Sequence, residues 1–211
     1  MRITEIFFSI QGESTYAGRP CVFVRLTGCP LRCTWCDTAY AFYGGTERSL
    51  ENILDDVEQY GCLLVEITGG EPLAQPAVHS LVAALADRSY TVLIETSGAL
   101  DLTPVDRRAV VIMDLKCPGS GMADRNRWTN LPLLKPTDEI KFVIKDRADY
   151  DWAVATVKEH RLTERHTVLF SPVFGEMDPQ ALAEWILADR LSVRYQLQLH
   201  KHIWDPATRS V

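Results

Sequence analysis

The chain has 211 residues, 46% of them hydrophobic and 24% charged, which is the composition of a globular protein able to bury one substantial core. Its net charge of −6, with no cluster of Lys and Arg, argues against direct binding to nucleic acid. The sequence contains no apolar run long enough to span a bilayer and no signal peptide at its start, so we expect a cytoplasmic protein without membrane attachment.

Short strand-like runs alternate with helix-like runs along the chain, and no linker or repeat divides them. In chain order the patterns predict a strand at 21–26, a helix at 49–60, a strand at 63–67, a helix at 78–87, strands at 90–94, 110–113 and 140–144, a helix at 150–160, a strand at 168–170, a helix at 180–189 and a strand at 193–199. Ser49 is a plausible N-cap of the first helix, and Gly61 is placed to end it. We therefore predict a single domain spanning residues 1–211.

The alternation of strands and helices predicts an α/β fold with mostly parallel strands. Strand after strand ends at polar or glycine-rich residues, and in such folds the working site lies at the carboxyl ends of the strands. Some connections, such as that between Gly98 and Val110, are too short for a full helix. The expected architecture is therefore a truncated TIM-type (β/α) barrel, with about six core parallel strands and few helices.

Three of the six cysteines lie within eight residues, in a loop directly after the strand at 21–26. Cys29, Cys33 and Cys36 have the spacing C-x3-C-x2-C. The remaining cysteines lie in or beside apolar runs and are expected to be ordinary buried thiols: Cys21, Cys62 and Cys117.

The number of clustered thiols separates the possible metal sites. A structural zinc site needs four closed ligands, and a ferredoxin supplies four thiolates to each cluster. Three thiolates on a [4Fe–4S] cluster leave one iron open, where the amino and carboxylate groups of S-adenosylmethionine (SAM) can bind and SAM can be cleaved to a 5′-deoxyadenosyl radical. The alternative is a non-catalytic iron–sulfur or zinc module, which would require a fourth protein ligand.

The cysteine spacing resembles the radical SAM superfamily, in which the residue before the last cysteine is typically aromatic, as Trp35 is here. The segment Thr68-Gly69-Gly70-Glu71-Pro72 follows the next strand and resembles the superfamily motif that meets the amino group of the SAM methionine. Its glycines allow a ligand to approach the backbone closely. Taken alone, the same segment could be a turn that closes the strand.

Further segments resemble the 7-carboxy-7-deazaguanine synthases along nearly the whole chain. They are Gln11-Gly12-Glu13, Arg25, Cys36-Asp37-Thr38, Glu95-Thr96-Ser97-Gly98 and Gln198-Leu199-His200-Lys201. The resemblance implies a carbon–nitrogen lyase that converts 6-carboxy-5,6,7,8-tetrahydropterin to 7-carboxy-7-deazaguanine and ammonia, beginning with hydrogen abstraction at C6, in the pathway to queuosine and other 7-deazapurines. It also implies recycled SAM, dependence on Mg²⁺, a homodimer and an electron donor such as a flavodoxin or ferredoxin.

The resemblance also implies roles for individual residues. Arg25 would pair with the substrate carboxylate, for which its planar fork is suited, and Thr38 would contribute a hydroxyl to Mg²⁺. The implied substrate-binding residues are Ile10, Gln11, Gly12, Arg25, Thr68 and His200. The implied SAM-binding residues are Trp35, Cys36, Asp37, Gly70, Glu95, Asp114, Leu115, Lys116 and Ser171. No catalytic acid or base is identified.

Two alternatives and one departure from the family remain. A glycyl-radical activating enzyme has the same cysteine spacing but needs a protein partner and gives no reason for Gln11, Arg25 and His200. Lys116 could instead form an ion pair with Asp114. The chain continues past Pro206 through residues 207–211, where some relatives have their terminal carboxylate near the substrate, so the role of this tail is open.

Overall fold

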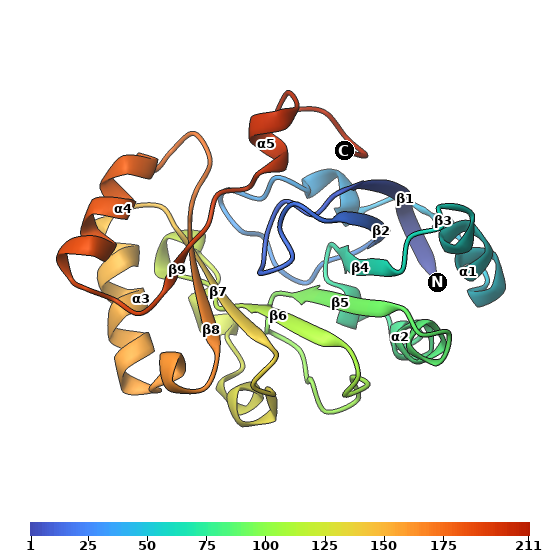
Figure 1. Cartoon of the computed structure of the whole chain (residues 1–211), viewed down its shortest axis with the longest axis horizontal. Coiled ribbons are helices and arrows are strands. Elements are labelled where there is room, and N and C mark those ends of the chain that lie inside the picture. Colours follow the sequence, from blue (N-terminus) through green and yellow to red (C-terminus); the bar gives the residue numbers. More distant parts are fainter.

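Nine strands form one curved sheet in the computed structural model, which describes residues 1–211 (Figure 1). Six strands run parallel: β2 (Pro20–Leu26), β4 (Leu64–Gly69), β5 (Thr91–Thr96), β6 (Val110–Asp114), β7 (Glu139–Ile144) and β8 (Thr167–Pro172). The short β9 (Arg194–Tyr195) pairs in parallel with β8. At the other edge, β1 (Arg2–Ile10) pairs antiparallel with β2, and β3 (Thr46–Glu47) with β1. The sheet does not close, which confirms the predicted truncated barrel.

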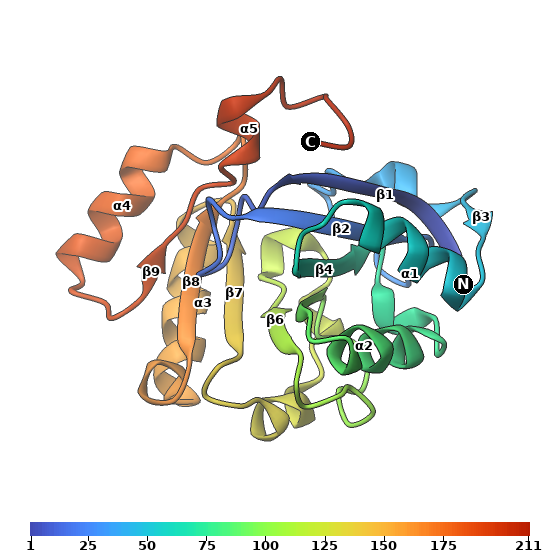
Figure 2. The ribbon, with the colours of Figure 1, turned by 45° about the vertical axis from the view of Figure 1, so that its right-hand side comes forward.

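Few helices cover the sheet. The α-helices are α1 (Leu50–Gln59), α2 (Val78–Asp87), α3 (Arg147–Glu159), α4 (Pro179–Ala188) and the short α5 (His200–Ile203). The 3-10 turns are η1 (Ala39–Phe42), η2 (Pro72–Ala74), η3 (Pro118–Ser120), η4 (Ala123–Arg125), η5 (Trp128–Leu133) and η6 (Leu162–Glu164). No α-helix connects β5 to β6, as the short connection after Gly98 predicts, and none connects β6 to β7. Figure 2 shows α1 and α2 beside one end of the sheet and α3 and α4 beside the other.

Most predicted elements are confirmed within a few residues, and the predicted cap of α1 is present. The Ser49 side chain accepts a hydrogen bond from the backbone N–H of Asn52, and Gly61 has the positive φ of 60° that ends a helix. The predicted last strand at 193–199 is wrong beyond Tyr195, because the chain leaves the sheet and His200 begins α5. The antiparallel β1 was not anticipated from the sequence.

Alternation along the parallel strands separates two apolar clusters. The larger lies between the sheet and the helices and includes Val24, Val65 and Ile67. The smaller lies on the opposite face of the strands, inside the barrel, and consists of Phe7, Cys21, Phe23, Leu64, Leu93 and Ile112. Two residues further along β4 and β5, the same inner face carries Glu66 and Glu95. The barrel is therefore plugged by apolar side chains at one end and lined with polar groups toward the carboxyl ends of the strands.

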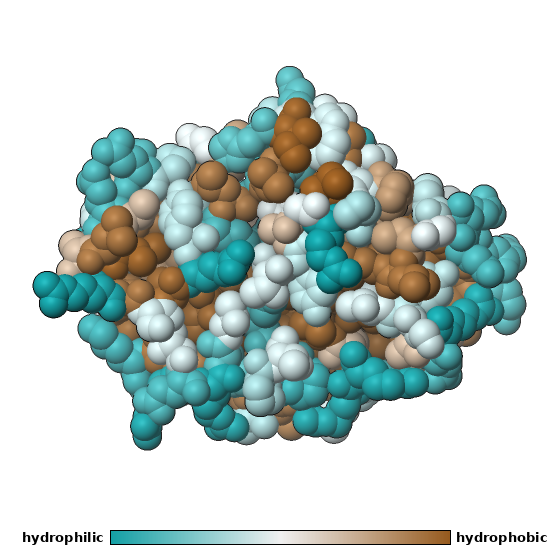
Figure 3. All heavy atoms as spheres, viewed as in Figure 1, coloured by the Kyte–Doolittle hydropathy of each residue, from teal (hydrophilic) through white to brown (hydrophobic).

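The surface mixes polar and apolar groups. Figure 3 shows hydrophobic side chains over α5 and near α4, where Ile203 and Leu187 are exposed. No helix has both the length and the apolar character needed to cross a bilayer.

Candidate active site

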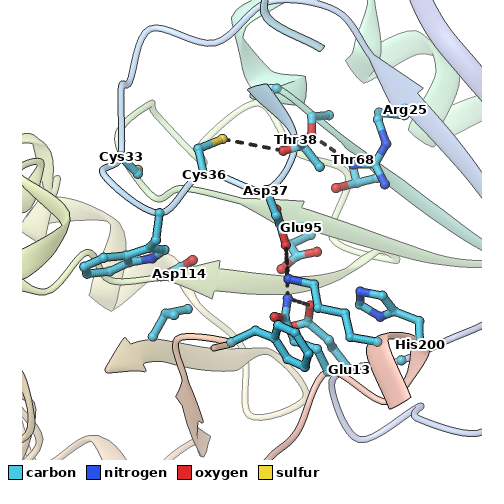
Figure 4. A pocket seen from close by; sticks show the side chains of 18 of the residues that line it. Glu13, Arg25, Cys33, Cys36, Asp37, Thr38, Thr68, Glu95, Asp114 and His200 are labelled. Atoms are coloured by element: carbon cyan, nitrogen blue, oxygen red, sulfur yellow. Dashed lines mark hydrogen bonds and ion pairs between the residues drawn. The ribbon is translucent and has the colours of Figure 1, made fainter. Parts of the chain in front are cut away.

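A cavity of about 640 Å³ opens at the carboxyl ends of the parallel strands. Its wall is built from the loops after β1, β2, β4, β5 and β6 and from the last residues of the chain. Figure 4 shows Cys33 and Cys36 on the loop at one side, with Arg25, Thr38 and Thr68 grouped beside them. Sequence-predicted residues in the cavity wall are Ile10, Gln11, Gly12, Arg25, Cys29, Cys33, Trp35, Cys36, Asp37, Thr38, Thr68, Gly70, Glu95, Asp114, Lys116 and His200. Leu115 is buried in the large apolar cluster and Ser171 is buried on β8, so neither lies in this wall.

The loop after β2 brings three thiols to the cavity without any disulfide. Cys29, Cys33 and Cys36 are partly buried and line the wall, whereas Cys21 and Cys117 are fully buried elsewhere. Burial raises the pKa of the Cys29 and Cys33 thiols. No three His, Cys, Asp or Glu side chains converge on a single metal ion. This donor set fits a [4Fe–4S] cluster, in which each thiolate binds a different iron.

Arg32 braces the cysteine loop. Its Nη1 donates to the backbone oxygens of Cys29 and Leu31, at 2.7 and 2.6 Å, and its guanidinium lies 4.2 Å from the centre of the Phe42 ring. These contacts fix the carbonyl groups of Cys29 and Leu31, at the start of the cysteine loop. The loop is therefore held by its own side chains as well as by β2.

The loop after β4 packs directly on the cysteine loop. The backbone N–H of Glu71 donates to the Gly28 oxygen at 2.8 Å, and a Cβ on Gly70 would overlap that same oxygen. The buried Glu71 carboxylate accepts hydrogen bonds from Thr96 Oγ1 and from the Ser97 N–H and hydroxyl, at 2.6–2.8 Å. Glu71 thereby ties the loop after β4 to the loop after β5. Gly70 permits the loop after β4 to approach the cysteine loop closely.

Arg25 lies in the cavity wall within a cluster of polar side chains. Its partner Glu5 stands opposite it in the β1–β2 register, with Arg25 Nε 2.7 Å from Glu5 Oε1. Tyr40 donates its hydroxyl to the same oxygen at 2.7 Å, and Arg25 Nη1 donates to the Gly69 oxygen at 3.1 Å. Burial opposes ionisation of Glu5, but hydrogen bonds from Tyr40, Ser210 and Arg25 hold its pKa below the ordinary value. The arginine is therefore fixed in direction, with its remaining N–H groups free.

A buried lysine joins two acidic groups from distant parts of the chain. Lys141 Nζ, on β7, is 2.9 Å from Glu13 Oε2 and also pairs with Glu95 on β5. Gln196 and Gln198 donate to the Glu13 carboxylate at 3.3 and 3.0 Å. Burial works against a charged Glu13, but Lys141 and the Gln198 hydrogen bond lower its pKa. Burial also works against a charged Lys141, whereas Glu13 and Glu95 raise its pKa.

The pKa of a second carboxyl, the buried Glu66, is shifted in the opposite direction from that of Glu13. Gln11 donates a hydrogen bond to Glu66, and no cation pairs with it. Burial, followed by the charges of Glu95 and Glu13, raises the pKa of Glu66 well above that of a free carboxyl. The surroundings of Glu66 therefore favour its protonated form.

The C-terminal segment completes the wall. The backbone N–H of Leu199 donates to the Gly12 oxygen at 2.9 Å, and a Cβ on Gly12 would overlap the His200 ring. Burial lowers the pKa of His200, so its imidazole is neutral at pH 7. Lys201 Nζ is 2.6 Å from Asp37 Oδ2, which ties this segment to the cysteine loop. Residues from both ends of the sequence thus meet at one cavity.

The loop after β6 supplies the last part of the wall. Lys116 Nζ is 2.7 Å from Asp114 Oδ2, so the alternative ion pair considered from the sequence is present. The other carboxylate oxygen, Asp114 Oδ1, is buried and has no hydrogen-bond partner. An unpaired buried acceptor is costly unless a ligand satisfies it. Its place in the cavity wall fits a bound molecule with hydroxyl or amino groups, such as SAM.

Several residues of this site were given no role from the sequence: Glu5, Glu13, Tyr40, Glu66, Lys141, Gln198 and Lys201. A signal for two of them exists, because Glu66 and Lys141 are charged residues within strands whose residues are mostly buried. A charge in such a strand marks the inner face of a barrel. The contacts of Glu5 and Tyr40 depend on β1, which the sequence patterns did not predict.

Comparisons with known proteins agree with this site. Residues 23–186 match the model of the Radical SAM superfamily. The 7-carboxy-7-deazaguanine synthase of Chlorobaculum tepidum is 47% identical over 214 residues, covering 100% of this chain and 97% of that protein. The protein of the same name from Koribacter versatilis is 48% identical over 230 residues and covers 100% of both chains. The crystal structure of QueE from Escherichia coli has the same fold, with a TM-score of 0.77, 23% identity and coverage of 94% of each chain.

Proposed function

The chain belongs to the radical SAM superfamily and, within it, to the 7-carboxy-7-deazaguanine synthases, and we propose that it converts 6-carboxy-5,6,7,8-tetrahydropterin to 7-carboxy-7-deazaguanine and ammonia. It is thus a carbon–nitrogen lyase, and its product would feed the pathway to queuosine. The observation that carries this proposal is one cavity whose wall holds both the three clustered thiols and Arg25.

Cys29, Cys33 and Cys36 would hold the [4Fe–4S] cluster. When bound, the cluster and SAM supply the electron and the radical that removes hydrogen from C6 of the substrate. No fourth cysteine lines the cavity, which agrees with an iron left free for SAM. The tight packing of Gly70 on Gly28 keeps the loop after β4 close to the cysteines.

Most of the remaining proposed SAM-binding residues lie in the cavity wall. Asp114 would use its unpaired Oδ1 to accept a hydrogen bond from SAM, while Lys116 holds the other carboxylate oxygen. Trp35, Asp37 and Glu95 lie in the same wall and keep their proposed contacts with SAM. Leu115 and Ser171 would act through their backbone or through neighbours, because their side chains are buried outside the wall.

The substrate would lie between Arg25 and the segment around Gly12. Arg25 would bind the C6 carboxylate with the N–H groups that Glu5 and Gly69 leave free, and Thr68 is its neighbour in the β2–β4 register. Ile10, Gln11 and Gly12 would bind the pterin edge. His200, neutral at pH 7, offers one ring nitrogen as donor and one as acceptor. Glu66, whose pKa is raised by burial, accepts a hydrogen bond from Gln11 and so supports that side chain.

The magnesium ion would bind to the Thr38 hydroxyl, which lines the cavity 3.8 Å from Cys36 Sγ. No cluster of acidic side chains is present there to hold a metal ion. This fits Mg²⁺, which keeps several waters and is often held by one or two protein oxygens together with substrate oxygens. A homodimer and a flavodoxin or ferredoxin as electron donor are proposed from the family alone.

Product formation tests the proposal. The protein is reconstituted anaerobically with iron and sulfide and mixed with SAM, Mg²⁺, a reductant and 6-carboxytetrahydropterin, and mass spectrometry looks for 7-carboxy-7-deazaguanine. We expect the product from the unaltered protein. Arg25→Ala should lose it while retaining the cluster and the ability to cleave SAM.

Two other results would contradict the proposal. SAM cleavage without any deazapurine would keep the radical chemistry and reject the substrate. A requirement for an added protein partner would favour a glycyl-radical activating enzyme.

A further inference from the structure

The last residues of the chain lie over the cavity beside Arg25. Pro206, Thr208, Arg209, Ser210 and Val211 all belong to the cavity wall. Figures 1 and 2 both place the C-terminus above β1 and β2, the two strands that carry Glu5 and Arg25. The tail therefore covers the end of the cavity where the substrate carboxylate is proposed to bind.

Two contacts fix the tail, and both are made to the cluster that orients Arg25. Ser210 Oγ donates to Glu5 Oε2 at 2.8 Å. The Arg209 guanidinium carbon lies 4.1 Å from the centre of the Tyr40 ring, a stacked cation–π contact. Tyr40 in turn donates to Glu5, the partner of Arg25. The tail is therefore anchored on the same side chains that orient Arg25.

The side chains around Arg25 lack a net positive charge, and Arg209 provides one. Arg25 is already paired with the ionised Glu5, so this pair carries almost no net charge. A substrate carboxylate arriving there would gain hydrogen bonds from Arg25 but little net attraction. Arg209 is exposed, lies in the cavity wall and makes no ion pair with an acidic side chain, so its positive charge is available to an anionic ligand.

We propose that Arg209 is a specificity-determining residue that binds the carboxylate of the substrate together with Arg25, in a tail positioned by Ser210 and Tyr40. The inference rests on the proposed function, since it assumes a pterin with a carboxylate at C6. It assigns the tail beyond Pro206 a role in selecting anionic substrates.

Steady-state kinetics of the reconstituted enzyme test the proposal. In Arg209→Gln, KM for 6-carboxytetrahydropterin should rise about tenfold, the effect of losing one charge-assisted contact, with kcat changed less than about twofold. Arg209→Lys should recover part of the loss, since it keeps the positive charge but not the planar guanidinium that stacks on Tyr40. The competing ligand tetrahydropterin, which lacks the carboxylate, should inhibit Arg209→Gln and the unaltered enzyme with the same Ki.

Arg190→Gln serves as the matched control, because it removes an exposed arginine outside the cavity wall and should leave every constant unchanged. Equal iron content in all variants shows that the cluster is intact. An unchanged KM in Arg209→Gln overturns the inference. An equal rise in KM and in the Ki of tetrahydropterin also overturns it, because the tail would then act by closing the cavity rather than by charge. Absence of product from the unaltered enzyme overturns the proposed function, and this inference with it.

Discussion

Glu66 is a buried carboxyl whose charged form is disfavoured by its burial and its acidic neighbours. It is 4% exposed, and its neighbours Glu13 and Glu95 share the single cation Lys141. A third negative charge there would be repelled by the other two and poorly solvated. Burial and these two charges therefore raise the pKa of Glu66.

Replacing Glu66 with Gln tests this protonation. Above the pKa of a free carboxyl, the unfolded chain releases a proton that folded Glu66 keeps, so the free energy of unfolding falls as pH rises until the raised folded pKa is reached. Glu66→Gln removes this contribution and should lose less stability than the unaltered protein between pH 5.5 and about 8. Urea unfolding at both pH values measures the difference, and parallel losses in the two proteins would show that Glu66 is ionised.

Lys141 is the cation that Glu13 and Glu95 share, and its loss would leave both acids without this partner. Removing one member of a buried ionic group costs about 3–5 kcal/mol, more than the group contributes as a whole. We expect Lys141→Met to destabilise the protein by about that amount, and to remove the charge that lowers the pKa of Glu13. Urea unfolding gives the change in stability. The exposed Lys158→Met is the control and should change it by less than about 0.5 kcal/mol.

At the residue scale, the sequence could reveal side chains defined by spacing or alternation but not those defined by partners. The three cysteines were found because their spacing in one loop is a motif, and Arg25 because its segment resembles the family. Glu5, Tyr40 and the tail acquire their roles only through contacts between segments distant in sequence, which local patterns do not encode.

At the scale of elements, the site depends on contacts between the loops that follow neighbouring parallel strands. The loop after β2 and the loop after β4 meet backbone to backbone, at Gly28 and Gly70. Backbone cannot yield as a flexible side chain can, so a methyl group at Gly70 forces the two loops apart. The glycine is needed here for space rather than for an unusual φ.

The substitution Gly70→Ala tests this contact. We expect it to lower the iron content after reconstitution and to abolish the change that SAM causes in the electron paramagnetic resonance spectrum of the reduced cluster. Gly61→Ala is the control: it introduces strain at a positive φ at the end of α1, with open space around it, and should lower stability while the cluster remains normal. Normal iron content and a normal SAM response in Gly70→Ala would contradict the account of the two loops.

The sequence predicted elements well where periodicity was strong and poorly where pairing decided the structure. Helix α2 has the predicted bounds, because its apolar residues repeat at helical spacing. Strand β1 was missed, since its identity depends on antiparallel pairing with β2. The alternating pattern at 193–199 predicted a strand, but Gln196 and Gln198 turn toward Glu13 and Asp37 instead of continuing a ladder beyond β9.

At the scale of the molecule, the open barrel is completed by the two ends of the chain. Its parallel strands provide one wall and an apolar plug, while the segment after β1 and the segment around α5 supply the other wall. The truncated barrel was predictable from the order of elements and the short connections. The completion of the barrel by the chain ends was not predictable from the sequence. The last residues carry no strong periodicity and are positioned by hydrogen bonds to Glu13 and Asp37.

The central claim is that this cavity directs radical chemistry to C6 of a carboxylated tetrahydropterin. The most direct test supplies substrate deuterated at C6 to the reconstituted enzyme with unlabelled SAM, and follows the label by mass spectrometry. We predict deuterium at the 5′ carbon of recovered SAM or 5′-deoxyadenosine, together with 7-carboxy-7-deazaguanine. Formation of the same product with no deuterium in the cofactor would contradict hydrogen abstraction from C6, and the site would then need a different assignment.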